Sequence, residues 1–304
     1  MEWKHVNEKE NLEAIEKFSE NLEIEGRSLW QDARIRFMRN KAAMASLVIL
    51  ALMTFAVIFL PMFAQYSFED TDWYAIHSAP SLTHFFGTDA LGRDLYVRTL
   101  VGGRISLMVG VMGALVAVLI GTLYGAASGF IGGKVDRVMM RILEILYAVP
   151  FMFLVIVLVT IFGRNIVLIF VAIGAIAWLD MARIVRGQTL SLRSKEFIEA
   201  AHVCGVSKWN IITRHIVPNV LGIVAVYSTL LIPSMILTES FLSFLGLGVQ
   251  EPMTSWGALL QEGANTMEVA IWQLAFPAAF MVVTLFCFNY VGDGLRDALD
   301  PKDR

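Results

Sequence analysis

Glu239 is the one carboxylate embedded in a long apolar stretch of this chain, which runs from Ile216 to Val249. Burying a charge inside such a stretch is costly, so a function is the first hypothesis for it: lining an outer gate, or bonding to a partner subunit. The alternative is a carboxylate that hydrogen-bonds to the backbone at an irregular turn. No Ser/Lys, two-Asp or His/Glu constellation stands at a matched depth, so we expect a chain with no catalytic residue.

A second polar feature is a short segment between two apolar stretches, with residue types suited to a contact with another protein. Its alanines allow close approach, and its carboxylate can pair with a basic partner or cap backbone donors. We expect this segment to plug into a groove on that protein. The alternative is an ordinary amphipathic loop between two membrane spans. The residues of this hypothesis are Phe197, Glu199, Ala200, Ala201, Gly205 and Pro218.

Local signals predict that this segment folds as a rigid helix–turn–helix. Ser194 can cap a helix over residues 195–201, and Gly205 supplies the left-handed turn that stops it. Ser207 can start a second helix that runs to Ile216, and Pro218 marks where the next membrane span begins.

The sequence also contains a glycine motif and two cysteines, neither of which meets the requirements of a nucleotide, disulfide or metal site. Gly132-Gly133-Lys134 suggests a phosphate loop, but such a loop needs Gly at position 128 and Ser or Thr at position 135, where this chain has Ser128 and Val135. We therefore expect no nucleotide or other cofactor site, and read the glycines around it as sites of close helix packing. The two cysteines exclude a disulfide framework, and no Cys/His metal spacing occurs.

Composition places these residues in a membrane. Hydrophobic residues make up 57% of the 304, and charged residues only 17%, against about 25% in an average soluble domain. A net charge of −3 provides no basic face for nucleic acid. Residues 1–25 are rich in Glu and lack the apolar core of a signal peptide, so we expect the first span to direct insertion.

The expected fold class is an all-α integral membrane protein with six transmembrane helices. A bilayer core needs about 20 apolar residues per helix. Uncharged runs that satisfy this lie at 42–64, 105–133, 145–163, 215–238 and 269–292, and a shorter sixth lies at 165–179. The division that follows is a cytoplasmic amphipathic leader (1–41), a first span (42–64), an outer loop (65–104), a five-helix core (105–292) with a cytoplasmic coupling loop (194–216), and a cytoplasmic tail (293–304).

Lysine and arginine then predict the orientation. Seventeen of them fall in the segments that share a side with residues 27–41, and four fall on the opposite side. The positive-inside rule therefore places both termini and the segment 194–216 in the cytoplasm.

Two sets of motifs resemble a known family. Glu199-Ala200-Ala201, Gly205 and Pro218 resemble the EAA loop of the membrane subunits of binding-protein-dependent ABC importers. That pattern has Ile three residues and Leu one residue before the proline, where this chain has His215 and Val217. Outer-side motifs resemble the dipeptide/oligopeptide/nickel permease branch: Phe86-Gly87-Thr88-Asp89, Gly92-Arg93-Asp94, residues 103–107 and 239–248, and Ser255-Trp256-Gly257. Residues 22–41 and the ending 292–301 are similar to the C-type subunit of a bacterial oligopeptide permease.

This resemblance implies a role and a set of partners. The implied role is a non-catalytic permease subunit in the bacterial inner membrane, forming half of a pathway for oligopeptides. The implied partners are a paralogous permease subunit, two ATP-binding subunits that hold ATP and Mg, and an external peptide-binding protein. Segment 194–216 would be the helix that couples to the ATPase. Outer residues would dock the binding protein or form a gate: Phe86, Gly87, Thr88, Asp89, Gly92, Arg93, Asp94, Glu239 and Trp256.

Other functions stay open at this point. The motifs are shared across the branch, so the cargo could be dipeptides, nickel or another small solute. An ion-coupled secondary transporter is a different class, but it favours several carboxylates deep in the spans and an inverted repeat. Only Glu239 meets the first condition, and no repeat is visible. A membrane-embedded enzyme would need a Ser/Lys, two-Asp or His/Glu constellation at matched depths, and this sequence has none.

Overall fold

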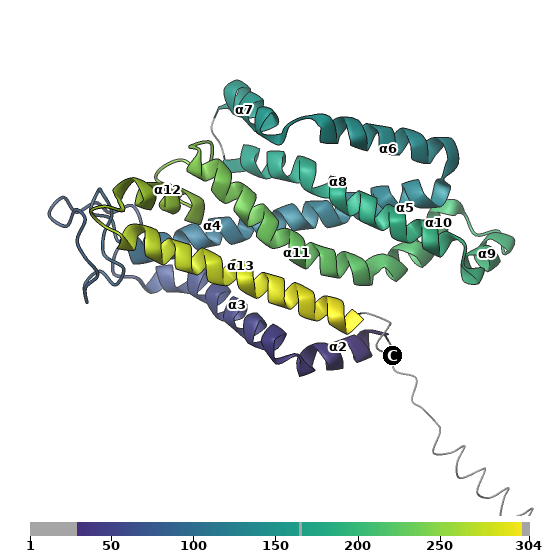
Figure 1. The fold of residues 1–304 in the computed structure, drawn as a ribbon, viewed down its shortest axis with the longest axis horizontal. Helices are drawn as coiled ribbons and strands as arrows, with labels where there is room; N and C mark the ends of the chain where they lie inside the picture. Colours follow the sequence, from purple (N-terminus) through teal and green to yellow (C-terminus); the bar gives the residue numbers. More distant parts are fainter. Residues whose placement is uncertain (1–28, 164–165, 300–304) are drawn as a thin grey trace, which may run out of the picture.

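A computed structural model describes residues 29–163 and 166–299, and every regular element in these two ranges is helical (Figure 1). The all-α membrane class is therefore confirmed. The elements, in chain order, are α2 (Leu29–Arg39), α3 (Lys41–Phe59), η1 (Leu60–Phe63), α4 (Leu95–Val116), η2 (Ala117–Gly121), α5 (Thr122–Ile131), α6 (Gly133–Ala148), α7 (Phe151–Phe162), α8 (Ile166–Arg193), α9 (Glu196–Val203), α10 (Lys208–Ile211), η3 (Ile212–Ile216), α11 (Val217–Phe244), α12 (Trp256–Thr266) and α13 (Trp272–Leu299).

Among the described residues, four helical segments are long and apolar enough to cross a membrane, or five if the bent pair α6 and α7 is one span. The four are Lys41–Phe63, Leu95–Ile131, Lys208–Phe244 and Trp272–Leu299. The expected leader up to residue 28 and the residues beyond 299 lie outside the described part.

Several helices extend beyond the apolar runs that predicted them. α4 begins at Leu95, ten residues before the expected start, because the Asp94 carboxylate accepts a hydrogen bond from the Val97 amide at 2.9 Å and caps the helix there. The first ten residues of α4 therefore lie within the segment expected as the outer loop. Likewise α8 continues to Arg193, and α13 continues to Leu299 through part of the expected tail. A helix need not end where the bilayer does.

The expected third span, 145–163, is not one helix but comprises the end of α6 and all of α7. α6 starts directly at Gly133 and ends at Ala148, and α7 follows at an angle of 74°. Pro150 lies at the break with extended backbone and is the N-cap residue of α7. Proline disfavours helical backbone in the residue before it, which is why α6 stops at this point.

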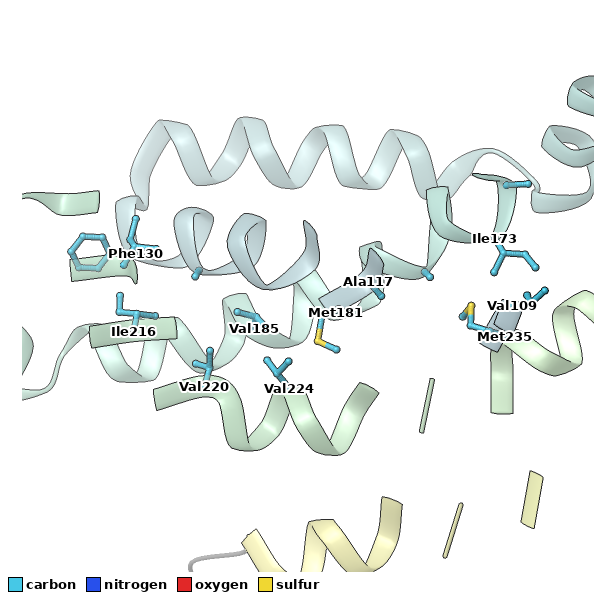
Figure 2. Packing of buried hydrophobic residues seen from close by; sticks show 14 of the residues in the cluster. Val109, Ala117, Phe130, Ile173, Met181, Val185, Ile216, Val220, Val224 and Met235 are labelled. Carbon is cyan, nitrogen blue, oxygen red and sulfur yellow. The ribbon is translucent and has the colours of Figure 1, made fainter. Parts of the chain in front are cut away.

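The core lies where α4, α5, α8 and α11 meet (Figure 2). Its buried side chains come from all four elements and the π turns η2 and η3, and include Val109, Ala117, Phe130, Ile173, Met181, Val185, Ile216, Val220, Val224 and Met235. A second cluster joins α3, α4 and α11 to Trp256 of α12. Apolar packing between these helices therefore holds the bundle together.

Three glycines allow α5 to approach α8 closely, as expected. A Cβ added at Gly121, Gly125 or Gly129 would lie 2.4 to 2.8 Å from atoms of α8. Gly132 and Gly133 were also expected to serve close helix packing. They have φ of 68° and 62° and form the turn between α5 and α6. Small residues in a membrane bundle serve both packing and turning.

Candidate functional site

The segment expected to couple to an ATPase, residues 194–216 and called the coupling loop from here on, lies at one end of the bundle, with α9 projecting from it (Figure 1). The expected helix is present as Glu196–Val203, but the expected Ser194 cap is wrong. Lys195 is the N-cap residue and makes no side-chain capping bond, while the Ser194 hydroxyl donates to the Ser191 carbonyl at 3.2 Å. Ser194 thus finds an acceptor in the last turn of α8.

The turn after α9 is closed as the sequence predicted. Gly205 has φ of 77°, its amide donates to the His202 carbonyl at 3.0 Å, and the Val206 amide donates to the Ala201 carbonyl at 3.1 Å. These two bonds and the left-handed residue form a Schellman motif, which satisfies carbonyls at the end of a helix. The turn between α9 and α10 is therefore a defined backbone structure.

The second helix starts as predicted and then does not stop. The Ser207 hydroxyl accepts a bond from the Asn210 amide at 3.4 Å and caps α10. The expected end before Pro218 is wrong, because α10, η3 and α11 form one run from Lys208 to Phe244. In the π turn the backbone N–H of Val217 donates to the Ile212 carbonyl. The side-chain amide of Asn219 donates to the His215 carbonyl at 2.6 Å. These bonds pair backbone carbonyls on the N-terminal side of Pro218, where the helical run continues.

The coupling loop presents apolar side chains to its surroundings. Phe197 is 42% exposed, and two residues that the sequence analysis missed are more so: Val203 at 88% and Trp209 at 58%. Trp209 could have been found from the sequence, because it is a tryptophan in a polar segment, two residues after the helix-starting Ser207. Ala201 was expected at the contact, but it is only 8% exposed and packs with Ile198 into the core, whereas Glu199 and Ala200 are exposed.

A hollow of about 290 Å³ lies between α9 and the end of α5. Glu199 lines it, together with basic side chains from the two neighbouring helices. The ring of His202 stacks on Phe130 at 5.9 Å between centroids. The complete lining is Phe130, Ile131, Arg193, Ile198, Glu199, His202 and Lys208. The loop thus combines a rigid turn, an exposed apolar surface and charged groups.

The opposite end of the bundle carries residues 64–94 and α12, which together we call the outer cap after the orientation expected from the sequence (Figure 1). Most of the outer-side residues singled out from the sequence are buried within it. Thr88 donates its amide to the Ser78 carbonyl at 3.0 Å, and the Gln273 amide of α13 donates to the Thr88 carbonyl at 2.7 Å. The buried members are Gly87, Thr88, Asp89, Gly92, Arg93, Asp94 and Trp256.

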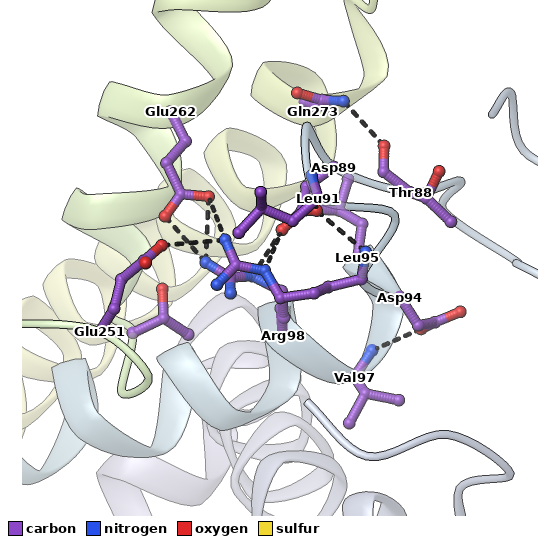
Figure 3. A network of polar contacts seen from close by, with 12 residues as sticks. Thr88, Asp89, Leu91, Asp94, Leu95, Val97, Arg98, Glu251, Glu262 and Gln273 are labelled. Carbon is purple, nitrogen blue, oxygen red and sulfur yellow. Dashed lines mark hydrogen bonds and ion pairs between the residues drawn. The ribbon is translucent and has the colours of Figure 1, made fainter. Parts of the chain in front are cut away.

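An ion network lies at the centre of the outer cap (Figure 3). Arg93 Nε lies 2.6 Å from Asp89 Oδ2, and Arg98 Nη2 lies 2.8 Å from Glu262 Oε1. Arg93 Nη2 also reaches Glu251 at 3.0 Å. Residues 89–98 are thereby joined to α12 and the loop that precedes it. Neither Glu251 nor Glu262 was singled out from the sequence as a partner of these arginines.

Burial and pairing act against one another in this network. Burial of Arg93 disfavours its charge, but the hydrogen bond and attraction of Asp89, with Glu251 and Glu262 adding to them, leave its pKa above the ordinary value. Burial raises the pKa of Glu262, although Arg98 and Arg93 act in the opposite direction. Charges held this way are costly to separate from their partners.

Aromatic rings complete the outer cap. The indole N–H of Trp256 donates to the Thr99 carbonyl at 3.0 Å, and the ring fits against Gly103 of α4. Phe86 stacks on Phe276 of α13 with 4.1 Å between centroids. These contacts hold the cap to α4 and α13.

Glu239 lies near the C-terminal end of α11 and is fully buried. It is hydrogen-bonded to serine hydroxyls and not to backbone, and the helix around it is regular, so the irregular turn considered above is wrong.

Comparisons with known proteins agree with this architecture. Residues 117–304 match the family of the binding-protein-dependent transport system inner membrane component. Residues 28–80 match the N-terminal TM domain of oligopeptide transport permease C.

Curated relatives match over nearly the whole length. The chain is 69% identical over 298 residues to the oligopeptide transport system permease protein OppC of Escherichia coli (strain K12), covering 97% of this chain and 99% of the relative. The protein of the same name from Haemophilus influenzae is 63% identical, covering 98% and 97%. The dipeptide transport system permease protein DppC of Bacillus subtilis is 42% identical, covering 100% and 93%. The chain therefore belongs to the family of inner membrane components of binding-protein-dependent transport systems, and within it to the oligopeptide permease C type.

Proposed function

We propose that this chain is one of two permease subunits that together form a transmembrane pathway for oligopeptides, driven by two separate ATP-binding subunits. The cargo is supported by the relatives named for oligopeptide transport at 69% and 63% identity, against 42% for one named for dipeptide transport. The chain itself binds neither ATP nor Mg in this proposal. The observation that carries the proposal is the rigid coupling loop with its exposed Phe197, Val203 and Trp209.

The proposed topology has six spans with both termini in the cytoplasm of a bacterial inner membrane. The bent pair α6 and α7 would be one span, and the 28-residue α8 another. The charge asymmetry supports the orientation. The coupling loop and the outer cap lie at opposite ends of the bundle (Figure 1), which supports one facing the ATPase and the other facing the outside.

The coupling step proposed here is mechanical. Phe197, Val203 and Trp209 would enter a groove on an ATP-binding subunit, and Glu199 would pair with a basic residue there. The Schellman turn at Gly205 keeps α9 and α10 in a defined relation. Since α8 leads into α9, and α10 continues into α11, a displacement of the loop would pass directly into both long helices.

On the outside, the proposal assigns a platform to the outer cap. Buried residues such as Asp89, Arg93 and Trp256 would shape this platform, and a peptide-binding protein would dock on the exposed residues around them. The motif residues 86–94 would therefore act indirectly, by fixing the position of the exposed residues that the binding protein contacts or that form a gate.

Reconstitution tests this function. The chain would be co-expressed with its paralogous subunit and the ATP-binding subunits, purified by a tag on the chain, and placed in proteoliposomes. We expect the ATP-binding subunits to co-purify, and uptake of radiolabelled oligopeptide to require ATP and the loaded binding protein. The variant Glu199→Lys should hydrolyse ATP without uptake. Peptide uptake driven by an ion gradient without ATP, or purification without an ATPase, would contradict the proposal.

A further inference from the structure

Glu239 is a fully buried carboxylate with hydrogen-bond donors from two helices. Its Oε1 accepts from the Ser243 hydroxyl of α11 at 2.6 Å, and its Oε2 accepts from the Ser106 hydroxyl of α4 at 3.1 Å. Both carboxyl oxygens therefore act as acceptors, and both serine hydroxyls point their protons toward them.

Each of these serines also accepts a bond from the start of α12. The Trp256 amide donates to the Ser106 oxygen at 3.1 Å, and the Ser255 hydroxyl donates to the Ser243 oxygen at 3.2 Å. Ser255 is the N-cap residue of α12 and accepts from the Ala258 amide at 3.2 Å. Two relays of the same polarity therefore run from the first turn of α12 through a serine to Glu239. A helix N-terminus favours negative charge, which suits this arrangement.

Backbone packing makes the junction tight. A Cβ added at Gly257 of α12 would lie 2.4 Å from the Cα of Ser240, the residue next to Glu239. A Cβ added at Gly102 of α4 would lie 3.0 Å from the backbone of Ser255. The start of α12 is thus wedged between α4 and α11, with Glu239 at its polar centre.

The helix that carries Glu239 also carries the coupling loop at its other end. The helical run from Lys208 to Phe244 has 37 residues, which corresponds to about 55 Å at 1.5 Å per residue. Glu239 lies five residues before the outer end of this run, and the Gly205 turn lies just before its inner end. One continuous element therefore joins the two polar ends of the bundle.

We propose that Glu239 is a positioning residue that ties the outer cap to the helix run from the coupling loop, so that a loaded binding protein on the cap stimulates the ATPase at the far end. This inference rests on the proposed function. It requires both carboxyl oxygens of Glu239 as acceptors, whereas glutamine has one acceptor oxygen and one donor nitrogen. Glutamine at this position would leave one of the two serine hydroxyls without its acceptor and reverse one relay.

The test uses the full complex in lipid nanodiscs and measures ATP hydrolysis with and without peptide-loaded binding protein. We expect Glu239→Gln to reduce the stimulation by the loaded binding protein about tenfold, within the range of typical coupling between sites, while basal hydrolysis persists. The matched control is Thr238→Ala, one residue away, whose exposed hydroxyl bonds only within its own helix to the Ser234 carbonyl. It should behave as wild type.

A second readout separates a tie from general instability. Hydrogen–deuterium exchange should show faster exchange at the first turn of α12, including the amides of Trp256 and Ala258, in Glu239→Gln and in Ser243→Ala, with exchange in the α5–α8 core unchanged. If Glu239→Gln showed the stimulation and the exchange of the wild-type complex, the inference would be overturned. The proposed function would still stand in that case, provided that the wild-type complex transports peptide. A wild-type complex without ATP-driven uptake would instead refute the function.

Discussion

Arg98 and Glu262 lie 164 residues apart in the sequence, and the Nη2 atom of Arg98 lies 2.8 Å from Oε1 and 3.0 Å from Oε2 of Glu262. The Arg98 side chain is fully buried at the start of α4, and its Nε also lies 3.3 Å from the Asp89 carboxylate. This one side chain therefore connects α4, the loop before it and α12.

Replacing Arg98 should destabilise the protein strongly. Arg98→Met removes the nearest counter-charge of Glu262 and leaves Asp89 with Arg93 alone, and breaking a buried pair from one side costs about 3–5 kcal/mol. Thermal unfolding of the purified chain in detergent measures this. The control is Arg141→Met, whose pair with Glu144 is on the surface and should contribute little. Arg98→Met combined with Glu262→Gln should recover part of the loss; equal melting temperatures for Arg98→Met and Arg141→Met would refute the assigned role.

Two neighbouring alanines of the coupling loop should respond differently to the same change. Ala201 is buried in the core, so Ala201→Leu should overpack it and cost about 1–3 kcal/mol of stability. Ala200 is exposed, so Ala200→Leu should fold normally and obstruct the contact with the ATP-binding subunit. Melting temperature and peptide uptake, measured on both variants, separate the two effects. Normal uptake by a well-folded Ala200→Leu variant would argue against a close contact at this position.

The turn at Gly205 should tolerate substitution poorly. A residue with a Cβ in left-handed backbone costs about 1–2 kcal/mol, and proline cannot adopt this φ at all. We expect Gly205→Ala to lower the ratio of uptake to ATP hydrolysis, and Gly205→Pro to abolish uptake with insertion intact. Gly187→Ala is the control, because Gly187 lies within α8 with open space around it. Uptake that is equal in Gly205→Pro and Gly187→Ala would show that the turn does not transmit force.

Close packing of α5 on α8 gives a prediction about stability alone. A Cβ at Gly125 would lie 2.4 Å from the Ala182 carbonyl oxygen, so Gly125→Ala should force the helices apart and cost about 1–3 kcal/mol. Gly222→Ala is the matched change, since the nearest atoms there, of Leu299, lie 3.8 Å away. Denaturation of the two purified variants side by side compares them, and a larger loss for Gly222→Ala would contradict the packing.

The coupling loop shows how far sequence reasoning reaches. Gly205 and Ser207 were predicted correctly because a left-handed turn and an N-cap are decided by one residue and its immediate neighbours. Ala201 was misplaced, since the side of a short helix that faces the bundle depends on how α8 and α11 pack. The end expected at Pro218 was wrong because a π turn, which no residue type signals, carries the helix through it.

The outer cap marks the limit of that reasoning. The motif residues Asp89 and Arg93 were found, but the pairing of Arg98 with Glu262 spans 164 residues and depends on the packing of α12 against α4. Glu239 was singled out correctly as a buried carboxylate. Its partners Ser106 and Ser243 could not be chosen from among the serines of the chain, because hydroxyl donors carry no pattern in the sequence.

The coupling loop contains its own probe for the central claim. Cys204 is exposed at the end of α9, whereas the other cysteine, Cys287, is buried. A photoreactive maleimide attached to Cys204 in inside-out membrane vesicles should cross-link to an ATP-binding subunit, with a yield that changes between the ATP-bound and nucleotide-free states. Cys204→Ser should abolish the product. Labelling of Cys204 by an impermeant maleimide in intact spheroplasts, or a cross-link to the external binding protein, would contradict the account.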